Sequence, residues 1–234
     1  MFTTLRSEMQ TKERKGNMEK KYVLTDESIE FYGHKLYRIE ALRSFGDVKA
    51  GDKGGYIGCE DNLSHGGNAW VYGNAKVCQR AVVNDNASVK HSAVVMDRAV
   101  VSGDAIVVGN SEISGNAWVS QRASVIDASV FDYARAGGFA RIMNAKIAGR
   151  ARVLGVAEVL HPNQVICFEN ILGDVLTFWR GRHGTIQVHS LKHNLVWELS
   201  VFKWKVKQDF KGYDRRLMLQ ACRLAKTQIV RCVK

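Results

Sequence analysis

This chain of 234 residues carries a formal net charge of +11, and 46% of its residues are hydrophobic. Such a length and apolar content suffice for a buried core in one or two domains. No apolar run approaches the roughly eighteen residues that a membrane-spanning helix needs. The five cysteines have neither metal-ligand nor disulfide spacing, which favours a reducing cytosol. We expect a soluble, cytoplasmic protein, and we expect it to hold no metal and no cofactor.

The N-terminal part of the chain divides into a tail and a cap. Residues 1–21 are polar and aperiodic, and we expect them to be disordered. In residues 22–55, the runs 22–25 and 35–39 look like short strands, and the glycine-rich run 51–55 follows them. We expect this segment to cap the repeat region that comes next, because an open strand edge would invite aggregation.

A six-residue repeat begins at Ala69 and runs without a slip to Val125. Each of its ten units has a small residue, alanine in nine and serine in one, and valine or isoleucine two residues later. With two one-residue deletions the pattern continues to Val159, and a degenerate form of it begins near Ile57. A short fixed period with one aliphatic and one small residue per unit is typical of a parallel β-helix.

The repeat resembles that of hexapeptide-repeat proteins, and this resemblance implies a triangular coil of three units with a left-handed sense. Residues eighteen apart then stack in columns. The aliphatic residue of each unit points inward and its two neighbours point outward, while glycine, asparagine or aspartate at the corners tolerates positive φ. We therefore predict a left-handed parallel β-helix for residues 56–161.

Pro162 is the only proline and follows the last repeat, so we place a domain boundary there. Residues 162–234 are expected to form a small α+β domain. Its predicted strands and helices lie at residues 165–168, 176–180, 185–189, 195–209 and 214–230. The run 202–207 alternates lysine with apolar residues and also suits a strand.

Helical spacing in the last predicted element places four residues on one stripe, namely Leu217, Ala221, Leu224 and Gln228. Residues 181–184 are expected to join two strands as a hairpin turn.

The positive charge is concentrated after the repeats. Residues 22–160 carry fifteen basic and fifteen acidic side chains, whereas residues 161–234 carry thirteen basic and five acidic ones. An acidic partner is therefore expected to meet this basic cap. The candidate partner-binding residues are Arg180, Arg182, Lys203, Lys205, Lys207, Lys211, Arg215 and Arg216. The aromatic residues among them are Phe178, Trp179, Trp197, Trp204 and Tyr213.

Basic residues mixed with aromatic ones suit single-stranded nucleic acid or an acidic protein surface. The same composition also suits a small ordinary core with a solvated lysine face. An acidic protein is the favoured partner, and nucleic acid is the alternative.

Two outward columns of the predicted prism are apolar. Val82, Val100 and Trp118 stack on one face, and a second face carries Trp70, Ile106, Val108 and Ile126. Exposed apolar columns on a rigid prism suggest burial against another subunit. We expect a homo-oligomer.

We find no convincing catalytic or metal-binding set in the sequence. Acyl transfer on a hexapeptide fold uses a histidine base beside a protruding loop, yet residues 69–125 contain no insertion, and His65 and His91 suit structural positions. His189 and His193 are a weak pair without a third metal ligand. The aspartates of the predicted corners suit turn formation better than calcium binding.

Several segments before and within the first repeats carry a more specific resemblance. They are YVLTD at 22–26, LYRIEAL at 36–42, FGDVKAGD at 45–52, DNLSH at 61–65 and GNAWVYGNA at 67–75. The set resembles phage and prophage hexapeptide-repeat proteins of the kind described as hexapeptide-transferase-like or polymer-forming. This resemblance covers residues 22–160 and implies the left-handed β-helix, a phage origin and a trimer. It implies no particular activity.

We therefore expect a non-catalytic, phage-encoded binding protein that assembles through its prism and engages a host macromolecule with its basic cap. An antagonist of a host defence system fits that description. Two alternatives stay open: an acyltransferase of the hexapeptide-repeat type, and an oligomer that sequesters nucleotides or binds nucleic acid. We expect no membrane partner.

Overall fold

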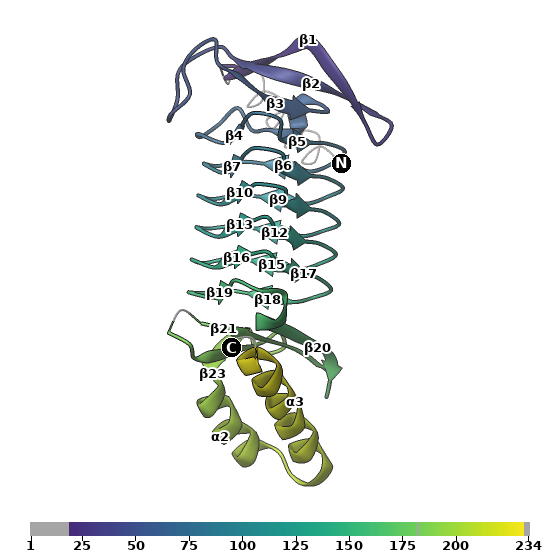
Figure 1. Cartoon of the computed structure of the whole chain (residues 1–234), viewed down its shortest axis with the longest axis vertical. Helices are drawn as coiled ribbons and strands as arrows, with labels where there is room; N and C mark the ends of the chain where they lie inside the picture. The colour runs from purple at the N-terminus through teal and green to yellow at the C-terminus, as the bar shows by residue number, and fades with distance from the viewer. Residues whose placement is uncertain (1–18, 182, 232–234) are drawn as a thin grey trace, which may run out of the picture.

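The computed structural model describes residues 19–181 and 183–231. Figure 1 shows an elongated molecule, with a prism of stacked coils between an N-terminal β cap and a C-terminal domain that ends in two helices. Residues 1–18 of the predicted disordered tail lie outside the described residues, as does the candidate site residue Arg182. The predicted fold class is confirmed: a left-handed parallel β-helix with a small α+β C-terminal domain.

The strands of the prism stack in three parallel columns, which we call the first, second and third faces. The first face also includes the three cap strands, and its members are β1 (Tyr22–Phe31), β2 (His34–Ala41), β3 (Lys53–Ile57), β5 (Lys76–Val77), β8 (Val94–Val95), β11 (Glu112–Ile113), β14 (Ser129–Val130) and β17 (Lys146–Ile147). The second face consists of β4 (Trp70–Val71), β7 (Ser88–Val89), β10 (Ile106–Val108), β13 (Ser124–Ile126), β16 (Arg141–Met143) and β19 (Glu158–Val159). The third face consists of β6 (Val82–Val83), β9 (Val100–Val101), β12 (Trp118–Val119), β15 (Arg135–Ala136) and β18 (Arg152–Val153).

The inward residue of each unit is fully buried, as the repeat predicts. Val71, Val89, Val107 and Val125 stack in parallel register on the second face, and each has 0% of its surface exposed. Burial of one such side chain stabilises the fold by about 1.5–3 kcal/mol. The alanines of the units are buried too, because the chain turns beside them and leaves no room for a larger side chain.

The corner aspartates link successive coils. Asp97 has a φ of 60°, and its Oδ2 accepts a hydrogen bond of 2.8 Å from the backbone N–H of Gly115 in the next coil. Asp132 makes the same bond with the N–H of Gly149 at 2.9 Å. Each carboxylate therefore satisfies a corner amide that no strand partner reaches, which accounts for the turn-forming role expected from the sequence.

The β cap closes the N-terminal end of the prism and begins earlier than predicted. Lys21, expected to be disordered, has 0% of its surface exposed, and its Nζ donates to the carbonyl of Ala69 at 2.8 Å. Trp70, expected to be an outward apolar residue, is 1% exposed because the rings of Phe45 and Tyr22 cover it. The tail therefore does not extend to Lys21, and Trp70 belongs to the core.

The C-terminal domain places an antiparallel sheet across the far end of the prism. Trp179 and Val165 on one side of this sheet belong to the core of the prism, whereas Leu176, Phe178 and Val188 on its other side pack against the two helices. The sheet order is β20-β21-β22-β23. The elements are β20 (Val165–Ile171), β21 (Asp174–Arg180), β22 (Ile186–Ser190), β23 (Leu195–Glu198), α2 (Leu199–Asp209) and α3 (Gly212–Arg231), and short 3₁₀ turns lie at η1 (Glu60–Asn62) and η2 (Pro162–Gln164).

Two details of the predicted helices are wrong. The first helix begins at Leu199 rather than at residue 195, because residues 195–198 form β23 and pair with β22. On α3 the predicted stripe is displaced, since Leu224 is 51% exposed. Ala221 of the predicted stripe is buried, and the buried side of the helix also includes Met218, Cys222, Ala225 and Ile229. The small side chains among them let the helix approach the sheet closely.

Candidate functional site

The candidate partner-binding residues come from β21, from α2 and α3, and from the link between the helices. Arg180 is half-buried at the end of β21, and Lys211 is exposed between the helices. Arg215 is half-buried, and its Nε donates to the carbonyl of Phe210 at 2.7 Å. Arg216 is exposed on α3. The set is therefore spread over the C-terminal domain rather than forming one patch.

The three lysines of α2 do not share one face. Lys203 and Lys207 are four residues apart and lie on the same side of the helix. Lys205 lies on the other flank of the buried stripe, where its Nζ is 4.0 Å from Oδ2 of Asp209. An alternating sequence would place all three lysines together on a strand, but the helical rotation of about 100° per residue separates them.

The outward side of α3 carries a row of positive charges that sequence reasoning only partly found. Arg216, Arg223 and Lys226 are all exposed, and no ion pair joins them to a described acidic side chain. We call these three residues the α3 row. Arg223 and Lys226 were missed, although their positions seven and ten residues after Arg216 indicate a common helical face.

Only two of the five expected aromatic residues are free to contact a partner. Phe178 and Trp179 are 0% and 1% exposed and belong to the two cores on either side of the sheet. Trp197 is half-buried against Phe202. Trp204 and Tyr213 are 60% and 67% exposed, at the outer surface of α2 and at the start of α3.

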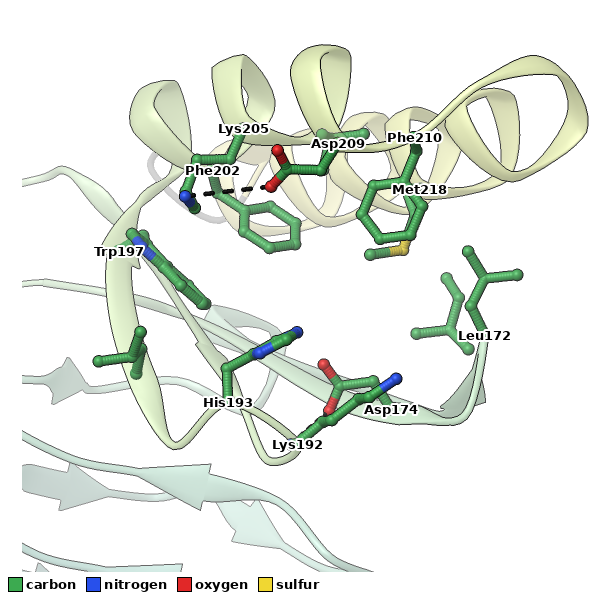
Figure 2. Close-up of a pocket in the computed structure, with 13 residues that line it drawn as sticks. Leu172, Asp174, Lys192, His193, Trp197, Phe202, Lys205, Asp209, Phe210 and Met218 are labelled. Carbon is green, nitrogen blue, oxygen red and sulfur yellow. Dashed lines mark hydrogen bonds and ion pairs between the residues drawn. The ribbon is translucent and has the colours of Figure 1, made fainter.

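A pocket of about 270 Å³ opens between the sheet and the helices. Figure 2 shows Trp197 and His193 on the sheet side of this space and Phe202, Phe210 and Met218 on the helix side. Lys205 and Asp209 lie along the helical rim. Sequence reasoning did not find this pocket, because its walls come from segments that lie far apart in the chain.

The predicted apolar column of the third face is present. Val82, Val100 and Trp118 occupy paired positions on β6, β9 and β12. The two valines are half-buried and Trp118 is 41% exposed. The next residue of the column is basic: Arg135 on β15 pairs with Trp118. The guanidinium of Arg135 lies 5.0 Å from the centre of the Trp118 ring.

The second face carries a longer apolar column than the sequence suggested. Val108, Ile126 and Met143 are paired on β10, β13 and β16, and all three are half-buried. Ile106 beside them is 43% exposed, and Leu160 at the next position of the repeat is 41% exposed. Met143 and Leu160 were missed because they follow the one-residue deletions.

Three histidines considered as candidate catalytic or metal-binding residues, His65, His91 and His189, occupy different environments. Nδ1 of His65 accepts from the backbone N–H of Lys21 at 3.2 Å, and its ring stacks on Tyr22. Burial lowers the pKa of His65, against the raising influence of Glu60. His91 is exposed at a corner with a φ of 62°. His189 is 1% exposed on β22, where burial and then the charge of Arg152 lower its pKa.

No protein-family model matches this chain, and no curated protein sequence matches it at a significant level. Among residues 19–181 and 183–231, no group of three or more histidine, cysteine, aspartate or glutamate side chains is placed to hold a metal ion. None of the described helices is long and apolar enough to cross a membrane. The geometry of the C-terminal domain is therefore the basis for assigning a function.

Proposed function

We propose that this protein is a non-catalytic binding protein whose C-terminal helices bind an acidic macromolecule, most favourably an acidic protein surface. One observation carries the proposal: the α3 row has no acidic partner among the described residues, in a domain with thirteen basic and five acidic side chains. Unpaired surface charges that are gathered on one side of a protein steer an oppositely charged partner towards it.

The length of the row suits a macromolecular partner. Arg216 and Lys226 are ten residues apart, which is about 15 Å along an α-helix. Tyr213 at the start of α3 and Trp204 on α2 add exposed aromatic surface to the same domain. Aromatic and arginine side chains together contribute much of the affinity in protein interfaces.

The remainder of the proposal concerns assembly and origin. The prism would serve as a rigid support that forms a homo-oligomer, a trimer in the favoured form, through the apolar columns of its second and third faces. A phage origin, a host target and a role against host defence rest on the resemblance of residues 22–160 to phage hexapeptide-repeat proteins. They form part of the same proposal, as does a location in the host cytoplasm.

The proposal is tested with two acidic probes, poly-L-glutamate and a single-stranded oligothymidylate. We expect poly-L-glutamate to bind the full chain and to bind more weakly as salt rises, because screening at 0.15 M limits charge interactions to about 8 Å. The triple variant Arg216→Glu, Arg223→Glu, Lys226→Glu should weaken this binding by at least about tenfold.

The matched control changes three exposed basic residues of the prism by the same charge: Arg80→Glu, Arg98→Glu, Lys146→Glu. Binding to this control should stay within about twofold of wild type if the contact is local to α3. Equal losses in both variants would contradict the proposal. Tighter binding of oligothymidylate than of poly-L-glutamate, lost in the α3 variant alone, would favour nucleic acid as the partner.

A further inference from the structure

The pocket of the C-terminal domain has mainly apolar walls. Trp197 comes from β23, Phe202 from α2 and Met218 from α3. Leu172 closes the side formed by the turn between β20 and β21. The volume of about 270 Å³ corresponds to roughly nine molecules of liquid water. A space of this size between apolar walls accepts a small molecule rather than a single ion.

The acidic and basic side chains at the pocket differ in whether they have partners within the protein. Oδ1 of Asp174 accepts from the backbone N–H groups of Val175 and Lys192, and its Oδ2 accepts from the hydroxyl of Ser190. The carboxylate of Asp209 faces Lys205. The carboxylate of Asp174 is therefore hydrogen-bonded within the protein, and the charge of Asp209 is offset by Lys205, whose Nζ lies 4.0 Å from it.

The basic groups on the sheet side have no such partner. The ammonium of Lys192 and the imidazole nitrogens of His193 make no hydrogen bond or ion pair with a described residue. The two residues follow each other in the turn between β22 and β23, and the ring of His193 lies edge-on to Trp197 at 6.4 Å. The free hydrogen-bonding capacity at this rim consequently consists mainly of donors.

We propose that this pocket binds a small apolar molecule that carries one acidic group. The apolar body would lie between Trp197, Phe202 and Met218, and the carboxylate or sulfonate would lie against Lys192 and His193. Apolar walls provide the affinity for such a ligand and a few placed charges provide its orientation. This inference does not depend on the α3 row, because the row lies on the outward side of α3 and the pocket lies on its inner side.

The probes are sodium octanoate and its neutral analogue 1-octanol, titrated into the full chain by calorimetry. Octanoate should bind at one site and at least about tenfold more tightly than octanol, since a charge-assisted hydrogen bond contributes on that scale. In protein labelled at its methionine methyl groups, octanoate should shift the resonance of Met218 in the pocket. It should leave that of Met143 on the prism unchanged.

Two pairs of variants locate the site. Leu195→Trp puts a larger side chain at the pocket, where Leu195 is 52% exposed, and should weaken octanoate at least about tenfold. Leu224→Trp makes the same change at a residue of α3 that is 51% exposed and does not line the pocket, and should have no effect. Lys192→Gln should remove the preference for octanoate over octanol, whereas Lys146→Gln on the prism should preserve it.

Three results would overturn the assignment. An unshifted Met218 resonance at saturating octanoate would place the ligand elsewhere or show that none binds. Equal affinities of the wild-type protein for octanoate and octanol would refute the claim that the ligand carries an acidic group. Equal effects of Leu195→Trp and Leu224→Trp, in variants with wild-type circular dichroism, would refute the pocket as the site.

Discussion

Single residues decide how the N-terminal cap joins the prism. A Cβ atom at Gly54 would lie 2.5 Å from Cγ1 of Ile39 and 2.6 Å from the carbonyl oxygen of Val71, so only glycine lets β3 pack at this point. Beside it, the ammonium of Lys21 donates to the carbonyls of Gly66, Gly67 and Ala69. These carbonyls would otherwise remain unsatisfied at the end of the coil.

Gly54→Ala is expected to lower the free energy of unfolding by about 2–3 kcal/mol, because backbone and a core side chain must move to admit the methyl group. Gly33→Ala is the control: a Cβ there meets nothing within 4 Å, although its φ is +73°. Gly33→Ala should lower the free energy of unfolding by about 1 kcal/mol, which is the cost of the strained backbone. Chemical denaturation measures both variants, and an equal loss would contradict the close packing at Gly54.

Lys21 should make stability depend on pH in the alkaline range. Burial, and then repulsion by Arg43, lower the pKa of Lys21 from 10.5 to about 8. Between these two values the unfolded chain binds a proton that the folded chain does not, so the free energy of unfolding rises with pH in this window. Denaturation of wild type and Lys21→Met at pH 7.5 and 9.5 tests this. The free energy of unfolding should rise less with pH in the variant than in wild type. The same rise in both proteins would count against the role of Lys21.

At the scale of elements, strand β21 in the interior of the C-terminal sheet is covered on both sides. Residues 174–179 of β21 are all buried, since one side of the strand faces the prism and the other faces α2 and α3. A strand covered in this way does not show the usual alternation of apolar and polar residues. His189 on β22 is enclosed by the same arrangement, with Arg152, Asp174 and Asn194 around it.

The buried His189 should weaken this region as the pH falls. Its pKa is lowered below the ordinary 6.5 by burial and by Arg152, with opposing influences from Asn194 and Asp174. The unfolded chain therefore takes up a proton first, and the free energy of unfolding decreases below about pH 6.5. His189→Leu should reduce this decrease between pH 7.5 and 5. Tryptophan fluorescence reports the transition, and an unchanged pH profile would refute the role of His189.

At the scale of the whole molecule, the prism leaves apolar columns on two faces while β1 and β2 extend the first face at the N-terminal end. The rings and side chains of Phe31, Ile29 and Met96 pack around Cys78 and Tyr56 there. No described segment covers the column from Val82 to Trp118, or the one from Val108 to Met143. These columns are the surfaces through which we expect copies of the chain to associate.

Val100→Glu should shift an oligomer towards the monomer, because a carboxylate buried at an interface loses its hydration without gaining a partner. Light scattering at micromolar concentration measures the mass, for which a monomer gives 26.2 kDa. The control is Ser120→Glu. Ser120 directly follows β12 and lies outside the column of Val82, Val100 and Trp118, so this variant should leave the mass unchanged. A wild-type protein that is already monomeric would contradict the proposed assembly.

The sequence alone determines the prism. A fixed period of six with one aliphatic residue per unit allows one way to bury every Val or Ile, namely in columns that repeat from coil to coil, so local pattern and global fold agree. The same periodicity predicted the outward column of Val82, Val100 and Trp118. Charge counting likewise placed the excess of basic residues in the C-terminal third.

Only the tertiary structure decided which side chains of the C-terminal domain reach the surface. Phe178 and Trp179 look like partner-binding aromatics in sequence, yet they fill the cores on the two sides of one sheet. The pocket is lined by residues of three strands, two helices and their turns. No local sequence pattern predicts that these distant segments come together. Packing between distant segments, rather than local secondary-structure propensity, decides which of these side chains are buried.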